Sequence, residues 1–172
     1  MSAPYLPDFE SRRLDGIAYA AIEAGRDGRF NVPLVTEIGA NLWMGGCVNG
    51  VRLPDEFEFV VSLYPWEKYQ LGRGTKRIEY PLLDSADVPD DALIARIVDD
   101  VTSARRKGRT LVHCQMGLNR SGLITAAVLM ANGIRPIHAI AMLRRKRHPL
   151  VLCNQAFEAW LLSQDTTSSE EN

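Results

Sequence analysis

One cysteine and one arginine in this sequence are spaced so that both can act on the same chemical group. Cys114 ends a short apolar run, five residues follow, and Arg120 begins a segment with a helical pattern. A chain that leaves a strand and enters a helix at this point can aim the amides of residues 115 to 120 at one anion. The Arg120 guanidinium can bind two oxygens of that anion at once. The same positive surroundings favour the thiolate of Cys114, which is the attacking form.

The complete pattern resembles the signature of the cysteine-dependent protein tyrosine phosphatases, in which His-Cys is followed by five residues, Arg and then Ser or Thr. His113, Cys114, Gly117, Arg120 and Ser121 meet every fixed position. A lone cysteine at a strand end is more often a buried structural residue. That alternative does not account for a glycine, an arginine and a serine at these spacings between a strand and a helix.

Within that superfamily the chain resembles the compact dual-specificity subfamily over about residues 35–162. Residues 42–46 look like the segment that opens its domain, and residues 143–157 look like its closing pattern. The chain is too short for the receptor-type domain and has no tyrosine-containing recognition loop. The resemblance implies an α/β fold with a central, mainly parallel sheet flanked by helices. It also implies a hydrolase that needs no metal or other cofactor.

The resemblance assigns a role to each side chain of the motif. Cys114 attacks phosphorus and forms a phosphocysteine, while Arg120 carries the charge on the phosphate oxygens. Ser121 donates to the sulfur as it leaves, and His113 organises the loop. The remaining expected phosphate-binding positions are those of the loop itself: Gln115, Met116, Gly117, Leu118 and Asn119.

The leaving oxygen needs a proton, which calls for a carboxylic acid from another loop. In the resembling family this aspartate lies some thirty residues before the cysteine. Asp84 is at that distance, directly after residues 80–83, and is the expected general acid. Asp87 lies three residues further in the same turn and remains the alternative.

The elements that position these residues follow from hydrophobic periodicity. We expect strands at residues 41–46, 57–63, 77–83 and 110–113, and helices at residues 9–24, 90–106, 120–132, 136–147 and 154–162. Strands alternating with helices indicate an α/β sandwich. The chain then divides into an N-terminal helical extension (1–30), a phosphatase domain (31–162) and a disordered acidic tail (163–172).

The composition is that of an ordinary soluble domain: 172 residues, 46% hydrophobic, 24% charged, with a net charge of −1. That charge disfavours a protein whose main task is to bind nucleic acid or an anionic membrane. Three cysteines form no disulfide framework and suit a reducing compartment. With neither a secretory signal nor a membrane-spanning run, a cytoplasmic location is expected. The sequence carries no signal for an oligomeric state.

The uncharged variable positions of the loop favour a phosphorylated protein as substrate. Phosphatases of inositol lipids tend to carry lysines there. Residues 117–120 also resemble the loop of RNA 5′-triphosphatases, although the acidic balance weighs against RNA. A phosphoprotein-binding pseudophosphatase would usually lack the cysteine or the arginine. The RNA, phosphoinositide and non-catalytic alternatives stay open.

Two other features each allow two interpretations. Cys153 is either a small buried residue or a partner that traps an oxidised Cys114 as a disulfide. Residues 144–147, which are Arg-Arg-Lys-Arg, either complement the dipole at a helix end or form an anion-binding patch.

Overall fold

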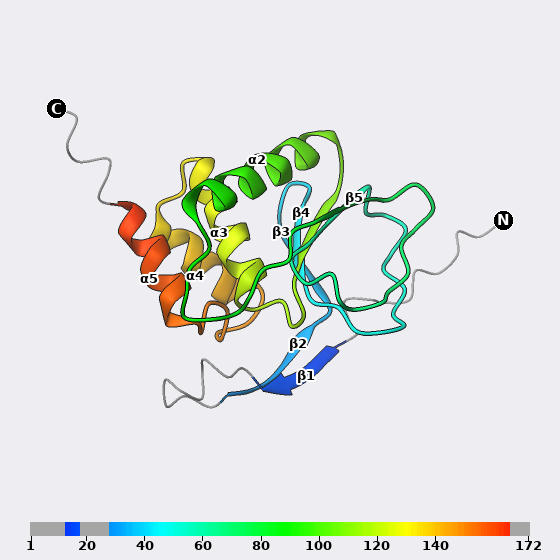
Figure 1. Cartoon of the computed structure of the whole chain (residues 1–172), viewed down its shortest axis with the longest axis horizontal. Helices are drawn as coiled ribbons and strands as arrows, with labels where there is room; N and C mark the ends of the chain where they lie inside the picture. The colour runs from blue at the N-terminus through cyan, green and yellow to red at the C-terminus, as the bar shows by residue number, and fades with distance from the viewer. Residues whose placement is uncertain (1–12, 18–27, 166–172) are drawn as a thin grey trace.

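The computed structural model describes residues 13–17 and 28–165, and a five-stranded sheet lies at its centre (Figure 1). The strand order is β3-β4-β7-β5-β6, with β3 antiparallel to β4 and the other neighbours parallel. The central strand β7 is buried along its whole length, as expected for a parallel strand covered on both faces. The strands are β3 (Val35–Gly39), β4 (Leu42–Gly45), β5 (Phe59–Ser62), β6 (Lys76–Glu79) and β7 (Thr110–His113).

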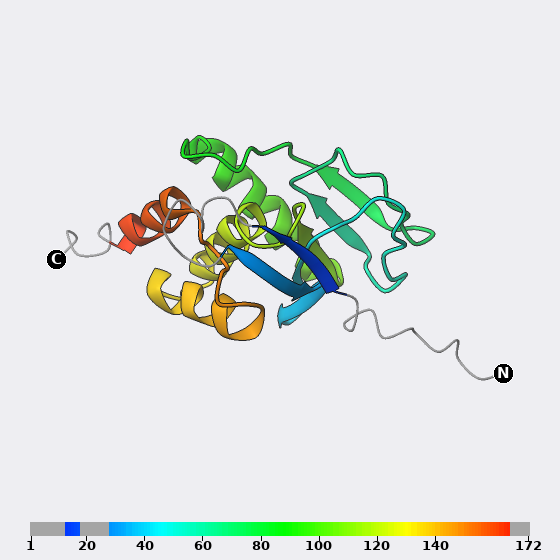
Figure 2. The same cartoon turned by 90° about the horizontal axis from the view of Figure 1, so that it is seen from below.

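Four helices complete the described part of this domain, and α3 lies among the other three (Figures 1 and 2). Residues 120–129 of α3 are all buried because the helix contacts α2, α4 and α5 as well as the sheet. This explains its apolar sequence on every side. Arg120 and Ser121, the first two residues of α3, are therefore held in place by a buried helix. The helices are α2 (Asp91–Lys107), α3 (Arg120–Ala131), α4 (Pro136–Lys146) and α5 (Gln155–Ser163).

The carboxyl ends of three parallel strands meet at one edge of the sheet. In the register of the ladders, His113 of β7 stands between Gly45 of β4 and Ser62 of β5. The segments that follow these strands therefore emerge side by side. This edge is where open α/β sheets usually hold ligands, and Cys114 is the first residue beyond it.

The predicted mainly parallel sheet and the four helices from residue 90 onward are confirmed, with small differences at the ends. The strand expected at 110–113 has those bounds. The strand expected at 77–83 ends at Glu79, because Pro81 cannot donate to the ladder. Helix α5 runs to Ser163, and Asp165 forms an ion pair with Arg135 (2.9 Å). The rest of the expected tail, residues 166–172, lies outside the described residues.

The helix expected at residues 9–24 is wrong for Arg13–Ile17, which form strand β1. This strand pairs antiparallel with β2 (Arg29–Pro33) in a separate two-stranded sheet. Leu14 is paired with Val32, and both are buried. A spacing of three between apolar residues fits a helix, but cross-strand burial decides this segment. Residues 9–12 and 18–24 lie outside the described residues, and the expected boundary after residue 30 falls inside β2.

Across residues 13–17 and 28–165, no helix is both long enough and apolar enough to cross a membrane.

Candidate active site

The loop between β7 and α3, residues 114–119, turns all of its carbonyl groups outward, where each accepts a hydrogen bond. A carbonyl and the following amide N–H point in opposite directions within one planar peptide. The amides of residues 115–120 are therefore directed toward the inside of this segment, which we call the Cys114 loop. The donors to its six carbonyls, in chain order, are His113 Nδ1 (3.0 Å), Cys47 N (2.9 Å), Arg147 Nη2 (3.3 Å), Arg147 Nε (2.6 Å), Leu152 N (3.2 Å) and Leu123 N (2.8 Å).

Arg147, the residue after α4, contributes two of these six bonds. Its side chain is buried, and Nη1 also donates to Thr36 Oγ1 (2.9 Å) and to the carbonyl of Met44 (3.3 Å). One guanidinium thus ties the Cys114 loop to strands β3 and β4. Arginine can bind these separate acceptors at once because the N–H groups of its guanidinium point in several directions, which those of lysine do not. Residues 144–147 are therefore more than a cluster of charges at a helix end, because Arg147 holds the Cys114 loop.

Gly117 could not be another residue at the turn of the loop. Its φ is +69°, a region that favours glycine. A Cβ there would stand 2.5 Å from the carbonyl oxygen of Gly45 and 2.4 Å from Nη2 of Arg147. The glycine of the signature is thus required by both its conformation and the close approach of β4.

The sulfur of Cys114 sits inside the ring of amides. Its Sγ accepts a hydrogen bond from the amide of Gly117 (3.2 Å) and lies 3.3 Å from Oγ of Ser121. Both side chains are buried. When the sulfur is a thiolate the Ser121 hydroxyl must be the donor, so two donors face the negative charge.

Arg120, the first residue of α3, presents an unused donor. The side chain is only 7% exposed, with Nη1 donating to the carbonyl of Leu82 (3.3 Å) and the guanidinium 4.8 Å from the centre of the Tyr64 ring. Its Nε is buried and has no hydrogen-bond partner within the described part of the chain. A buried donor without a partner costs about 1–3 kcal/mol. The arrangement is therefore suited to an acceptor from outside the chain, such as a phosphate oxygen.

Asp84 is tied directly to the Cys114 loop. One carboxylate oxygen accepts from Nδ2 of Asn119 (3.0 Å) and the other from Nδ2 of Asn154 (2.8 Å). The two amides are themselves connected, because the backbone N–H of Asn154 donates to Oδ1 of Asn119 (2.9 Å). For Asp87, by contrast, no side-chain hydrogen bond is found within residues 13–17 and 28–165. Of the two aspartates left open by the sequence, Asp84 is the one that contacts the Cys114 loop, and its role as the general acid stays a prediction.

His113 lies behind the loop as a neutral ring. Burial lowers the pKa of His113 to about 4. Since Nδ1 donates to the carbonyl of Cys114, Nε2 must accept, and the hydroxyl of Tyr69 donates to it (2.6 Å). Burial also raises the pKa of Tyr69 to about 12. Neither group changes charge near neutral pH, so the pair is suited to holding the loop rather than to transferring protons.

Apart from Gly117, the expected phosphate-binding positions of the loop fall into two groups. Gln115 and Met116 have half-buried side chains near the surface, whereas those of Leu118 and Asn119 are buried in the protein. The last two can therefore reach a bound phosphate only through their backbone amides. Those amides, with the ones of Gln115 and Met116, donate to no group among the described residues.

The other two cysteines are buried thiols. Burial, reinforced by the nearby Cys114, raises the pKa of Cys47 to about 12, so it stays protonated. The thiol of Cys153 donates to Oδ1 of Asn119 (3.4 Å). This contact agrees with a structural role for Cys153, and the disulfide with Cys114 remains only a prediction.

Comparison with known proteins agrees with this geometry. The sequence model of the dual specificity phosphatase catalytic domain matches residues 55–167. The chain belongs to the dual specificity phosphatase family. The dual specificity protein phosphatase OPG106 of variola virus is 33% identical over an alignment of 107 residues, and the match covers 57% of this chain and 60% of the viral protein. The chain thus spans less than two thirds of that relative.

Two solved structures share the fold of this chain. Human DUSP28 superposes with a TM-score of 0.68 and 18% identity, covering 80% of this chain and 99% of DUSP28. OH1 from the Orf virus gives a TM-score of 0.59 and 20% identity, covering 76% and 85% of the two chains. The architecture is therefore that of the family although most side chains differ.

Replacing Arg147 by lysine tests whether its forked side chain holds the Cys114 loop in its conformation. Lysine keeps the charge but cannot serve the carbonyls of Met116 and Gly117 together with Thr36. We expect Arg147→Lys to lower the free energy of unfolding by about 2 kcal/mol and to weaken competitive inhibition by vanadate. Arg145→Lys, an exposed change in the same helix, is the control. Equal vanadate inhibition in both variants would contradict the role given to Arg147.

Replacing Asn154 by serine separates its two functions. Oδ1 of Asn154 caps helix α5 by accepting from Ala156 N (3.1 Å), and serine caps about as well. The amide that reaches Asp84 is lost, however. We expect Asn154→Ser to keep its melting temperature near that of the parent protein. Its kcat on a phosphoester with a poor leaving group should fall about 10- to 100-fold. If Asn154→Ser keeps full activity while replacement of Asp84 still removes activity, Asn154 does not position Asp84.

Proposed function

We propose that this chain hydrolyses phosphomonoesters through a phosphocysteine intermediate. The observation that carries the proposal is the convergence of donors on one sulfur. The inward amides of the Cys114 loop face a thiol that already accepts from Gly117, and Arg120, which begins the helix after this loop, keeps a buried Nε without a partner among the described residues. Such preorganised donors stabilise the charge on the equatorial oxygens of a transferring phosphoryl group, where most of the catalysis of phosphoryl transfer lies.

In the first step Sγ of Cys114 attacks phosphorus, and the bond from phosphorus to the ester oxygen breaks. The departing oxygen takes a proton from Asp84. Among the described residues, each carboxylate oxygen of Asp84 receives one amide donor. Because a carboxylate offers about four lone-pair positions, sites for the catalytic proton remain while the two asparagines hold the group in place.

In the second step a water molecule attacks the phosphocysteine and gives a proton back to Asp84. The bond from phosphorus to sulfur breaks, and sulfur leaves as a thiolate. The hydroxyl of Ser121, 3.3 Å from Sγ, stabilises this leaving group by donating to it. The products are inorganic phosphate and the enzyme in its starting form.

A phosphorylated protein is the substrate class that we propose. Variola OPG106 is named a dual specificity protein phosphatase, and the Orf virus OH1 is described as a tyrosine phosphatase with triple substrate specificity. Gln115 and Met116, the two half-buried side chains of the loop, carry no charge for additional phosphates. A reducing compartment such as the cytoplasm suits the catalytic thiolate.

Replacing the nucleophile tests the covalent route. Cys114→Ser should abolish turnover of p-nitrophenyl phosphate because a hydroxyl in this setting is a far weaker nucleophile than a thiolate. Binding of vanadate or phosphate, which depends on Arg120 and the amides, should survive, and isothermal titration measures it. A chelator should leave the parent activity unchanged. Appreciable turnover by the serine variant would falsify the covalent mechanism.

Leaving-group dependence distinguishes Asp84 from Asp87. A general acid matters most when the leaving group is poor. Asp84→Asn should therefore lower kcat by about 10²–10⁴ on an ordinary phosphoester, and by much less on a substrate with an activated phenol. Asp87→Asn is the matched control from the same turn. If the control shows this signature and Asp84→Asn does not, the acid has been assigned to the wrong residue.

A further inference from the structure

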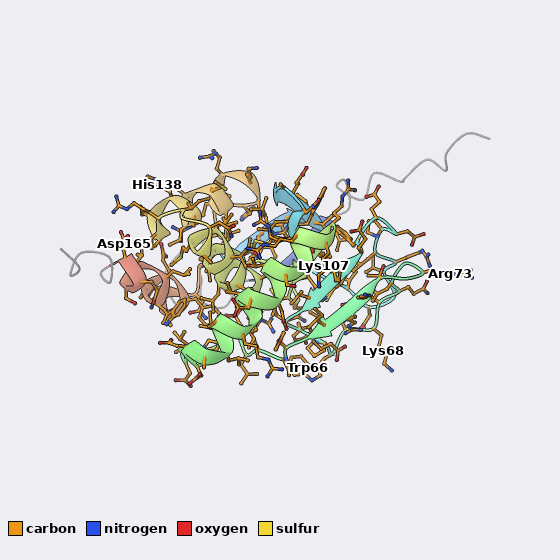
Figure 3. All side chains as sticks on the ribbon, turned by 90° about the horizontal axis from the view of Figure 1, so that it is seen from above. Trp66, Lys68, Arg73, Lys107, His138 and Asp165 are labelled. Atoms are coloured by element: carbon orange, nitrogen blue, oxygen red, sulfur yellow. The ribbon has the colours of Figure 1, made fainter. Side chains whose placement is uncertain are left out.

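An open pocket lies at the same edge of the sheet as Cys114, in the segments that follow β4 and β5. Its volume is about 600 Å³, and it is lined by Asn49, Gly50, Trp66, Lys68, Tyr69 and Gln70. Figure 3 labels two of these side chains, Trp66 and Lys68, at the margin of the molecule on the side of β5 and β6. Of the residues described in the candidate active site, Tyr69 alone belongs to this lining, and its hydroxyl donates to His113.

The frame of the pocket is held by hydrogen bonds between its two segments. The amide of Gly50 donates to the carbonyl of Lys68 (2.7 Å), and the amide of Lys68 donates to Oδ1 of Asn49 (2.8 Å). The amide of Gln70 donates to the carbonyl of Val51 (2.8 Å), and the carbonyl of Gln70 accepts from the amide of Leu53 (2.9 Å). The pocket is therefore preformed, which lowers the cost of binding.

A chain of aromatic contacts connects the pocket to the catalytic arginine. The Trp66 ring packs edge to face on the Tyr64 ring at 4.9 Å, and Tyr64 lies 4.8 Å from the guanidinium carbon of Arg120. The centre of the Trp66 ring therefore lies no farther from the guanidinium carbon of Arg120 than the sum of these two distances. An extended peptide advances about 3.3 Å per residue. The pocket is within reach of a side chain two or three positions from a phosphorylated residue.

The chemistry of the pocket combines an exposed aromatic ring with a cation. The Trp66 side chain is 55% exposed, which is unusual for such a large apolar group. Lys68 is exposed and forms no ion pair with any residue in the described part of the chain. Its neighbour Glu67 turns one carboxylate oxygen into the protein, where that oxygen is buried. Among the six residues that line the pocket, Lys68 alone is charged, so the lining is positive and suits a carboxylate.

We propose that this pocket is a substrate subsite, which binds an acidic side chain two or three residues from the phosphorylated residue of a protein substrate. Lys68 pairs with the carboxylate, and the indole of Trp66 packs against the methylene groups beside it. The subsite rests on the proposed phosphatase function and adds a sequence preference to it. A single cation in a chain of net charge −1 favours a peptide over RNA, whose binding depends on several phosphate contacts.

The test compares phosphotyrosine peptides that differ only in carrying Glu or Lys at the second and third positions on either side. For each protein, kcat/KM on each peptide is divided by its own kcat/KM on p-nitrophenyl phosphate, which corrects for changes in the catalytic centre. The parent protein should prefer the Glu peptides by about threefold or more. Lys68→Glu should abolish or reverse this preference. Trp66→Ala should lower the normalised kcat/KM on both the Glu and the Lys peptides.

Lys107→Glu is the matched control because it changes the same charge at the exposed end of α2, near the opposite edge of the sheet (Figure 3). It should keep the parent preference. An equal preference in the parent, Lys68→Glu and Lys107→Glu proteins would overturn the subsite while leaving the phosphatase function intact. So would a 5′-triphosphorylated RNA that loses kcat/KM in Lys68→Glu while the peptides do not. No turnover of any phosphoester by the parent would overturn both proposals.

Discussion

The outward carbonyls of the Cys114 loop are the constraint on which the rest of the site depends. A loop that offers its amides to an anion must satisfy the carbonyls of the same peptides elsewhere, because a buried unpaired carbonyl is costly. Here the six donors come from five separate parts of the chain: the end of β7, the segment after β4, the residue after α4, the segment before α5 and the first turn of α3. The packing of the sheet and helices thus determines which way the loop faces.

The same loop also organises the residues around it. Asn119 extends from the loop to Asp84, and Asn154 reaches the same carboxylate from the start of α5. On the other side, Tyr69 donates to His113 and also lines the open pocket. Cys114, Asp84 and the neighbouring pocket are therefore connected through one hydrogen-bonded unit, so a change at its supports should affect the proposed function while leaving both residues in place.

What could be predicted from the sequence was mostly local. The strand at 110–113 and the helix from Arg120 follow from contiguous apolar residues, and the motif fixed Cys114, Gly117 and Ser121 by spacing alone. The supports of the loop could not be predicted in this way. Arg147 stands in a run of four basic residues that looks like an ordinary helix end, and nothing local distinguishes the buried member from the exposed ones. The N-terminal hairpin could not be predicted because the spacing of Leu14 and Ile17 fits a helix, whereas the pairing of Leu14 with the distant Val32 decides the structure.

The most direct test of the account is to trap the covalent intermediate. The protein is mixed with an excess of p-nitrophenyl phosphate, quenched in acid within the first turnovers and digested, and the peptides are analysed by mass spectrometry. The account predicts a phosphoryl group on the sulfur of Cys114, increased in amount when Ser121 is replaced by alanine because breakdown of the intermediate is slowed. Steady turnover with no phosphoryl group on Cys114, or with the group on another residue, would contradict it.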